Sequence, residues 1–126
     1  YGEGADVVYH AAGATGGGVF NAAGEHGRLA IGVDSDQSLS SDASDTIVAS
    51  MVKHVDTAVF NATKDVVNDE FKGGSTVTLG LDDDGVEAVV GKDYEGEIPS
   101  DVLDALESSR QAIIDGEIDV PTEPEN

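Results

Sequence analysis

A strand, a glycine-rich turn, a helix and a second strand follow one another at the start of the chain. Residues 6–12 are short, β-branched and apolar, which predicts a buried strand. Residues 13–18 make the turn, a short helix opens at Val19, and residues 29–33 predict a second buried strand. Because such crossovers are right-handed, these two strands should be parallel. The order therefore predicts an α/β fold with a parallel sheet.

The rest of the chain continues with short elements. The periodicity predicts a strand at 46–52, a helix from Val55 to near Phe71, strands at 76–81 and 86–90, a helix from Ser100 that Gly116 ends, and a polar tail at 121–126. No run is long enough for a membrane helix.

The charge of the chain limits its partners. Its 26 acidic and 6 basic residues leave a formal charge of -20, which excludes nucleic acid and anionic membrane surfaces as partners. A disordered acidic polymer would also need low hydrophobicity, whereas 39% of these residues are hydrophobic and fall into periodic segments. A folded domain that tolerates its charge in concentrated salt fits best, since at ~1 M salt the Debye length is roughly 3 Å. We expect a halophilic archaeal source.

No catalytic residue or metal site is evident. The chain has no cysteine, so thiolate ligands and disulfides are excluded. The Asp run at 82–85 lacks the glutamate of a calcium loop, a position that Gly91 occupies, and we interpret the run as a turn. The three histidines are scattered and no serine lies in a G-x-S-x-G motif. We therefore expect no enzyme activity, no cofactor and no metal.

Gly16, Gly17 and Gly18 form the first candidate binding element. Without Cβ atoms they let a ligand approach the main chain, and the free N–H groups of the following helix favour oxygen ligands. The spacing does not match the dinucleotide motif, and no Walker lysine follows. A tight turn with close helix packing explains the same glycines equally well.

Asp34, Asp36 and Lys53 are the other candidates. A carboxylate at the end of a buried strand can accept two hydrogen bonds from a sugar diol, as Asp34 could. Asp36 is a further acceptor, although a solvated loop acid is the simpler interpretation. Lys53 is one of only four lysines, and it either reaches a ligand or pairs with a nearby acid.

Three motifs then occur in a specific order: AGATGGGVF at 12–20, AIGVDSDQ at 30–37 and ASMVKHVDTAV at 49–59. With them the chain resembles the basic membrane protein family, the purine nucleoside receptor-like substrate-binding lipoproteins of ABC transporters. The similarity spans residues 6–121. The resemblance implies a two-lobed fold of the type 1 periplasmic-binding-protein kind, with three-layer, Rossmann-like lobes, of which this chain is the C-terminal part.

The resemblance also implies a division of the chain. Residues 1–53 would belong to the second lobe and cross the hinge near 51–54. Residues 54–121 would form the hinge and a first-lobe helix with return segments, and residues 122–126 a polar tail. The N-terminal lobe of the same protein would be a partner.

The implied function is binding of a nucleoside, with purines preferred, between the lobes. Asp34 would hold the ribose hydroxyls, Lys53 would reach the sugar from the hinge, and the turn at Gly16, Gly17 and Gly18 would offer N–H groups. Tyr9 is the local aromatic candidate for the base, although core packing is its preferred role. The whole protein would serve an ABC permease at the extracellular face of the cell membrane, lipid-anchored through an upstream segment.

Two other classes of function remain open from the residues. A Rossmann-like enzyme domain could bind a nucleotide or phosphorylated sugar, with the glycine turn on the phosphate and Asp34 on the ribose, but it needs a catalytic residue. An acidic interaction module would have no ligand cleft.

Overall fold

The computed structural model describes residues 1–122, which fall into two compact units. The first runs from Tyr1 to Glu95, and the second begins at Gly96. The last four residues of the expected tail, 123–126, lie outside the described residues. The division into lobes at 53/54 remains a prediction.

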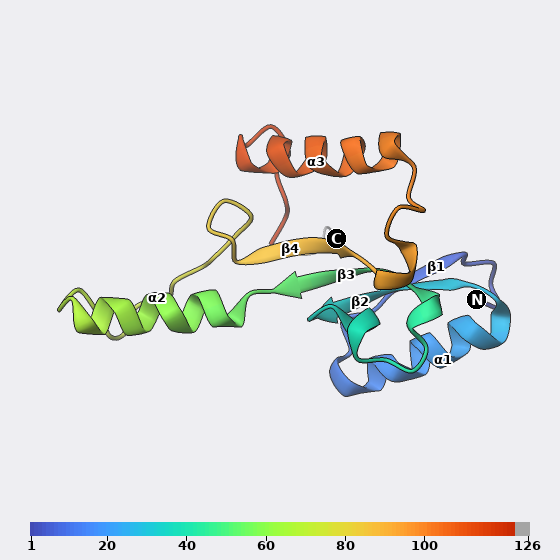
Figure 1. Ribbon diagram of the computed structural model, residues 1–126. Coiled ribbons are helices and arrows are strands. Elements are labelled where there is room, and N and C mark those ends of the chain that lie inside the picture. Colours follow the sequence, from blue (N-terminus) through green and yellow to red (C-terminus); the bar gives the residue numbers. More distant parts are fainter. Residues whose placement is uncertain (123–126) are drawn as a thin grey trace. The chain divides into compact units, whose positions relative to one another are not determined.

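A four-stranded sheet organises the first unit (Figure 1). Its strands are β1 (Val7–Tyr9), β2 (Leu29–Asp34), β3 (Ile47–Lys53) and β4 (Val86–Val90), in that order across the sheet. β1, β2 and β3 are parallel, and β4 pairs antiparallel with β3. The predicted α/β class and parallel β-α-β unit are therefore confirmed, with one antiparallel strand added.

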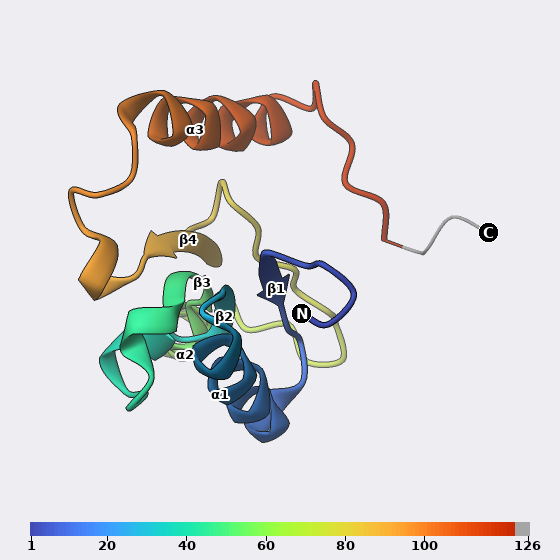
Figure 2. The same cartoon turned by 90° about the vertical axis from the view of Figure 1, so that its right-hand side faces the viewer.

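Helix α1 (Gly17–His26) covers one face of this sheet (Figure 2). The buried core is small and consists of Phe20 and Ala23 from α1, Ala30 from β2 and Ile47 from β3. The helix ends at Gly27, whose φ of 58° is a left-handed conformation that suits glycine. The core thus fixes α1 against the two central strands, which places the start of the helix at their carboxyl edge.

The first strand differs from its prediction. It has three residues instead of seven, and Val7 and Tyr9 are exposed rather than buried. Because β1 is the edge strand of the described sheet, it has a hydrogen-bonded neighbour on one side only. The core role preferred for Tyr9 is therefore wrong, and its side chain is half exposed.

A predicted strand is absent from the described structure. Residues 76–81 adopt no regular structure, so the expected hairpin around the Asp run does not form. The run itself is a turn, as predicted, with Asp84 at a φ of 53°. β4 instead returns directly to β3, and the Gly85 carbonyl accepts from the His54 N–H at 2.9 Å.

Helix α2 (Val55–Val67) begins where predicted and ends four residues before Phe71. None of its residues is buried, and Figure 1 shows it extending beyond the end of β3. Its exposed large apolar side chains are Val55, Val59, Phe60, Val66 and Val67.

The second unit contains α3 (Ser100–Ile114). Pro99 occupies the N-cap position, and Ser100 is the first helical residue, as predicted. Gly116, at a φ of 73°, follows the helix as predicted. No helix in residues 1–122 combines the length and the apolar character needed to cross a bilayer.

Candidate functional site

Two sequence-predicted residues meet at the carboxyl edge of the parallel strands. β2 ends at Asp34 and β3 ends at Lys53, and these neighbouring strands are in parallel register with Asp34 opposite Val52. Lys53 Nζ lies 3.0 Å from Asp34 Oδ1. The carboxyl edge of a parallel sheet is where α/β proteins bind ligands.

This ion pair is open to solvent. The side chains of Asp34 and Lys53 are 58% and 52% exposed, so the pair contributes only about 0–1 kcal/mol to stability. Its contact uses one carboxylate oxygen, and a ligand can approach both groups. The pair therefore suits an oxygen-rich ligand: the carboxylate accepts from hydroxyl groups and the ammonium donates to oxygens.

The backbone at Asp34 is strained. Its φ of 73° is unusual for a residue other than glycine, and the Ser35 N–H donates to the Val33 carbonyl at 3.0 Å. The bond closes a tight turn centred on Asp34. Strain of this kind is common at binding sites, because the surrounding structure must hold it.

Sequence reasoning missed the two residues that hold this turn. Gln37 Oε1 accepts from the Val33 N–H at 2.8 Å, and the Ser50 hydroxyl oxygen accepts from the Gln37 N–H at 3.1 Å. Ser50 is fully buried in β3. A Cβ at Gly32 would lie 2.7 Å from Ser50 Oγ and 3.0 Å from Gln37 Oε1, so glycine leaves the space that these side chains fill. The Gly-x-Asp-x-x-Gln spacing at 32–37 was a sequence signal for Gln37, and it does not extend to Ser50.

Asp36 has a structural use in the same loop. Its Oδ1 accepts from the backbone N–H of Ser38 at 3.0 Å and from the Ser38 hydroxyl at 2.6 Å. The oxygen of that hydroxyl also accepts from the Lys92 N–H at 2.9 Å. Asp36 thus caps a 3₁₀ turn (Gln37–Leu39), and its ligand role stays a prediction with less support than that of Asp34.

The glycine turn is partly helical. A 3₁₀ turn (Gly13–Gly16) leads directly into α1, so Gly17 and Gly18 form the first helical turn instead of preceding it. No side chain caps this end of the helix. Gly17 and Gly18 are exposed, and a Cβ at either would meet no atom within 4 Å. The Gly17 N–H bonds to the Thr15 carbonyl.

Gly16 differs from the other two because it is buried against His10. A Cβ on Gly16 would lie 2.0 Å from Cε1 of the imidazole. Of the three glycines, Gly16 is required by packing, whereas Gly17 and Gly18 leave the main chain accessible to a ligand. The packing explanation therefore applies to Gly16, and the ligand-binding role of Gly17 and Gly18 stays a prediction.

A histidine follows Lys53 at the expected hinge crossing. His54 Nε2 lies 3.0 Å from Glu87 Oε2 in β4, and His54 Nδ1 lies 3.8 Å from Asp56 Oδ1 in α2. These contacts connect the start of α2 to the sheet.

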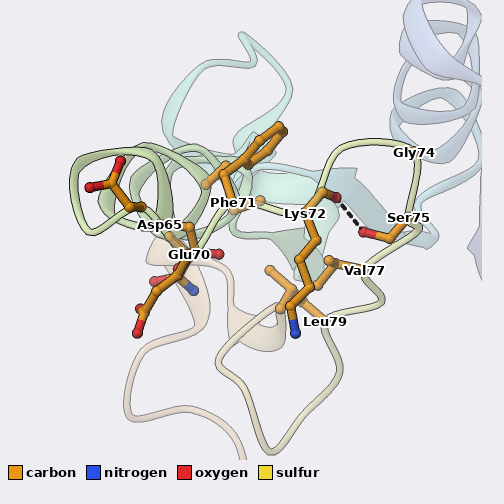
Figure 3. A pocket seen from close by; sticks show the side chains of 12 residues that line it. Asp65, Glu70, Phe71, Lys72, Gly74, Ser75, Val77 and Leu79 are labelled. Atoms are coloured by element: carbon orange, nitrogen blue, oxygen red, sulfur yellow. Dashed lines mark hydrogen bonds between the residues drawn. The ribbon is translucent and has the colours of Figure 1, made fainter.

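A separate hollow of about 690 Å³ lies between α2 and the segment that follows it (Figure 3). Phe71 and Val77 line it with acidic and small side chains, and the Ser75 hydroxyl donates to the Lys72 carbonyl at 2.7 Å. None of the predicted site residues lines it. Its walls include large apolar side chains that are more than half exposed.

The described residues provide little for other chemistry. Within residues 1–122, no cluster of three or more His, Asp or Glu side chains could hold a metal ion. Burial raises the pKa of the Tyr1 phenol, which donates to the Leu29 carbonyl at 2.7 Å. Burial also raises the pKa of Tyr94, and the charges of Asp45 and Asp93 add to the effect.

Known proteins match nearly the whole length of this chain. The family model of the PnrA-like ABC transporter substrate-binding proteins matches residues 1–123. The CD4+ T-cell-stimulating antigen of Listeria monocytogenes is 36% identical over 98% of this chain and 38% of its own length. The ABC transporter nucleoside-binding protein BmpA of Lactococcus lactis is 36% identical over 97% of this chain and 38% of its own length.

Solved structures agree with these matches. A solute-binding protein of an ABC transporter system from Aeropyrum pernix superposes with a TM-score of 0.77 at 30% identity, covering 98% of this chain and 42% of that one. A Bacillus halodurans protein described as a transcriptional activator of the comK gene has a TM-score of 0.76 at 24% identity, over 90% of this chain and 38% of its own, which shows the shared fold alone.

The chain spans about two fifths of the length of these relatives. The matched family consists of substrate-binding proteins and not of enzymes, in agreement with the expectation from the sequence. The chain belongs to the family of PnrA-like ABC transporter substrate-binding proteins.

Proposed function

We propose that this chain forms part of the solute-binding component of an ABC importer and holds a purine nucleoside through Asp34 and Lys53. The observation that carries the proposal is the solvent-open ion pair at the carboxyl edge of β2 and β3. Two ribose hydroxyls can donate to the Asp34 carboxylate, and Lys53 can donate to an oxygen of the sugar. A relative described as a nucleoside-binding protein, matched over 97% of this chain, supports the ligand class.

The start of α1 completes the proposed site. The exposed Gly17 and Gly18 permit close approach of a ligand to the main chain, and N–H groups at a helix start favour oxygen acceptors. The Gly17 N–H already bonds to the Thr15 carbonyl, so the Gly18 N–H is the proposed donor. Asp36 is proposed as an outer residue, because its Oδ1 already accepts from Ser38.

A second lobe is part of the proposal. α2 carries five large apolar side chains that are exposed, and the relatives are more than twice as long as this chain. We assign the cover of α2 to an N-terminal lobe of the same protein, with the nucleoside held between the lobes. In this proposal the whole protein acts at the extracellular face of the cell membrane, anchored by a lipid on an upstream segment, and delivers its solute to a permease.

The test is ligand-induced stabilisation. Thermal unfolding is measured in molar KCl with adenosine, guanosine, inosine or uridine, on this chain and on a longer form that includes the upstream residues. A ligand at ~100 times its Kd should add roughly 2.7 kcal/mol to the free energy of unfolding. Asp34→Asn should abolish the shift, because the amide replaces one acceptor oxygen by a donor, while asparagine tolerates the positive φ.

Asp83→Asn is the matched control, since it removes the same charge in the exposed turn before β4. It should leave the ligand-induced shift intact. A shift that persists in Asp34→Asn would contradict the assignment of the site, and no shift with any nucleoside in the longer form would refute the function.

A further inference from the structure

His10 is a buried polar residue that the proposed site does not use. It directly follows β1 and is only 5% exposed. Its imidazole packs edge to face on Phe20 of α1, with ring centroids 5.1 Å apart and an interplanar angle of 63°. A buried histidine therefore packs against the small core, next to the start of the helix.

The imidazole occupies the space in front of Gly16. A Cβ on Gly16 would lie 2.5 Å from both ring nitrogens and 2.0 Å from Cε1. Gly16 is the residue immediately before α1. The position of this ring thus determines how closely the N-terminus of α1 approaches the end of β1.

One hydrogen bond indicates the tautomer. The Ala12 N–H donates to His10 Nδ1 at 3.4 Å, so Nδ1 acts as the acceptor and the N–H of the ring is assigned to Nε2. Nε2 is buried, and it has no hydrogen-bond partner among the described residues. A buried donor without an acceptor is costly, and a hydrocarbon ring at this position would avoid that cost.

We propose that His10 is the positioning residue of the glycine turn. By accepting from Ala12 and filling the space before Gly16, it positions the backbone of Gly17 and Gly18. Its effect on solute binding rests on the proposed function, because that stretch of backbone is part of the proposed nucleoside site. Its effect on the conformation of the turn is independent of the proposed function.

The first measurement is the protonation of the ring. Side-chain nitrogen NMR of the chain at neutral pH in molar KCl should show His10 as the Nε2–H tautomer. His26 and His54, which are less buried, serve as internal references. An imidazolium or an Nδ1–H tautomer at His10 would overturn the proposal, whatever the protein binds.

The second measurement compares two variants. His10→Phe keeps an aromatic ring and removes both nitrogens, whereas His10→Asn offers an acceptor close to the position of Nδ1. In His10→Phe we expect shifted amide resonances and faster hydrogen exchange at Ala12, Gly17 and Gly18, in a protein that still unfolds cooperatively. His10→Asn should restore these amide signals in part, although its side chain fills less space.

Binding of inosine adds a readout that separates the two proposals. The Kd should be weakened roughly tenfold in His10→Phe, the equivalent of one hydrogen bond, and less in His10→Asn. Unchanged amide signals and an unchanged Kd in a folded His10→Phe would refute the role of His10. If the wild-type protein binds no nucleoside, the proposed function fails, while the tautomer and the amide signals still decide the role of His10.

Discussion

Gly16 provides a sharp test of the packing around His10. A Cβ would overlap a buried ring that has Phe20 on another side, so Gly16→Ala should lower the free energy of unfolding by about 1–3 kcal/mol. Gly18→Ala is the matched control, because its Cβ meets no atom within 4 Å and alanine favours helix by up to ~1 kcal/mol. Urea unfolding in molar KCl should give opposite signs for the two variants. Equal stability of the two variants would contradict the packing of Gly16 against His10.

The raised pKa of Tyr94 predicts that the free energy of unfolding depends on pH. Burial and the charges of Asp45 and Asp93 raise its pKa above 10, and its phenol donates to the Asp45 carbonyl. The folded state therefore keeps this proton up to a higher pH than the unfolded state. The stabilisation by the phenol is complete below pH 10 and is lost as the pH rises through the pKa of the folded state.

Tyr94→Phe should lower the free energy of unfolding at pH 7 by about 1 kcal/mol and reduce its decline above pH 10. Urea unfolding between pH 7 and 11 measures both effects. Tyr9→Phe, at a half-exposed position, is the control and should match the wild-type pH profile. A pH profile of Tyr94→Phe equal to that of the wild type would argue against the role of this phenol.

At the scale of elements, local patterns predicted the central strands and the helices. Asp34 and Lys53 lie together because each ends a β-branched apolar run, and parallel strands bring such ends together. Their ligand roles stay predictions. The roles of Gln37 and Ser50 were not predictable, because they depend on how β2 is placed against β3. The predicted strand at 76–81 does not form for the same reason, because strand propensity alone provides no neighbouring strand to pair with.

Ser50 should link the pairing of β2 with β3 to the proposed nucleoside site. Ser50→Ala leaves the Gln37 N–H without its acceptor in a part-buried position, at a cost of about 1–3 kcal/mol. It should also weaken nucleoside binding, because Gln37 holds Val33 beside Asp34. Chemical denaturation and titration calorimetry measure the two effects. Ser40→Ala, in an exposed turn, should change neither, and equal effects in both variants would disprove the coupling.

Helix α2 tests whether a further lobe covers it. Val59 is exposed, so Val59→Ser should change the stability of this chain by no more than ~0.5 kcal/mol. In the longer form we expect a loss of about 1–3 kcal/mol, because the valine would be buried there. Lys64→Gln on the same helix should be neutral in both forms. A Val59→Ser variant that is equally stable in the longer form would exclude burial of this residue by another lobe.

At the scale of the whole molecule, the charge of -20 opposes the compact state, and salt relieves this repulsion. The Debye length falls from ~10 Å at 0.1 M to ~3 Å at 1 M salt, so the free energy of unfolding should rise with KCl. A variant with six exposed acids changed to amides has a formal charge of -20 + 6 = -14 and should depend less on KCl. The replaced residues are Glu3, Glu25, Asp42, Asp83, Glu97 and Asp104.

The urea midpoint of both proteins at 0.1, 1 and 3 M KCl measures this difference. Screening acts on charge, so the variant should gain less stability than the wild type between 0.1 and 1 M, where the Debye length changes most. Salt also strengthens the burial of apolar surface, but that effect is the same in both proteins because the six side chains lie outside the core. An identical salt dependence would mean that apolar burial, and not charge repulsion, limits the stability of this chain in dilute buffer.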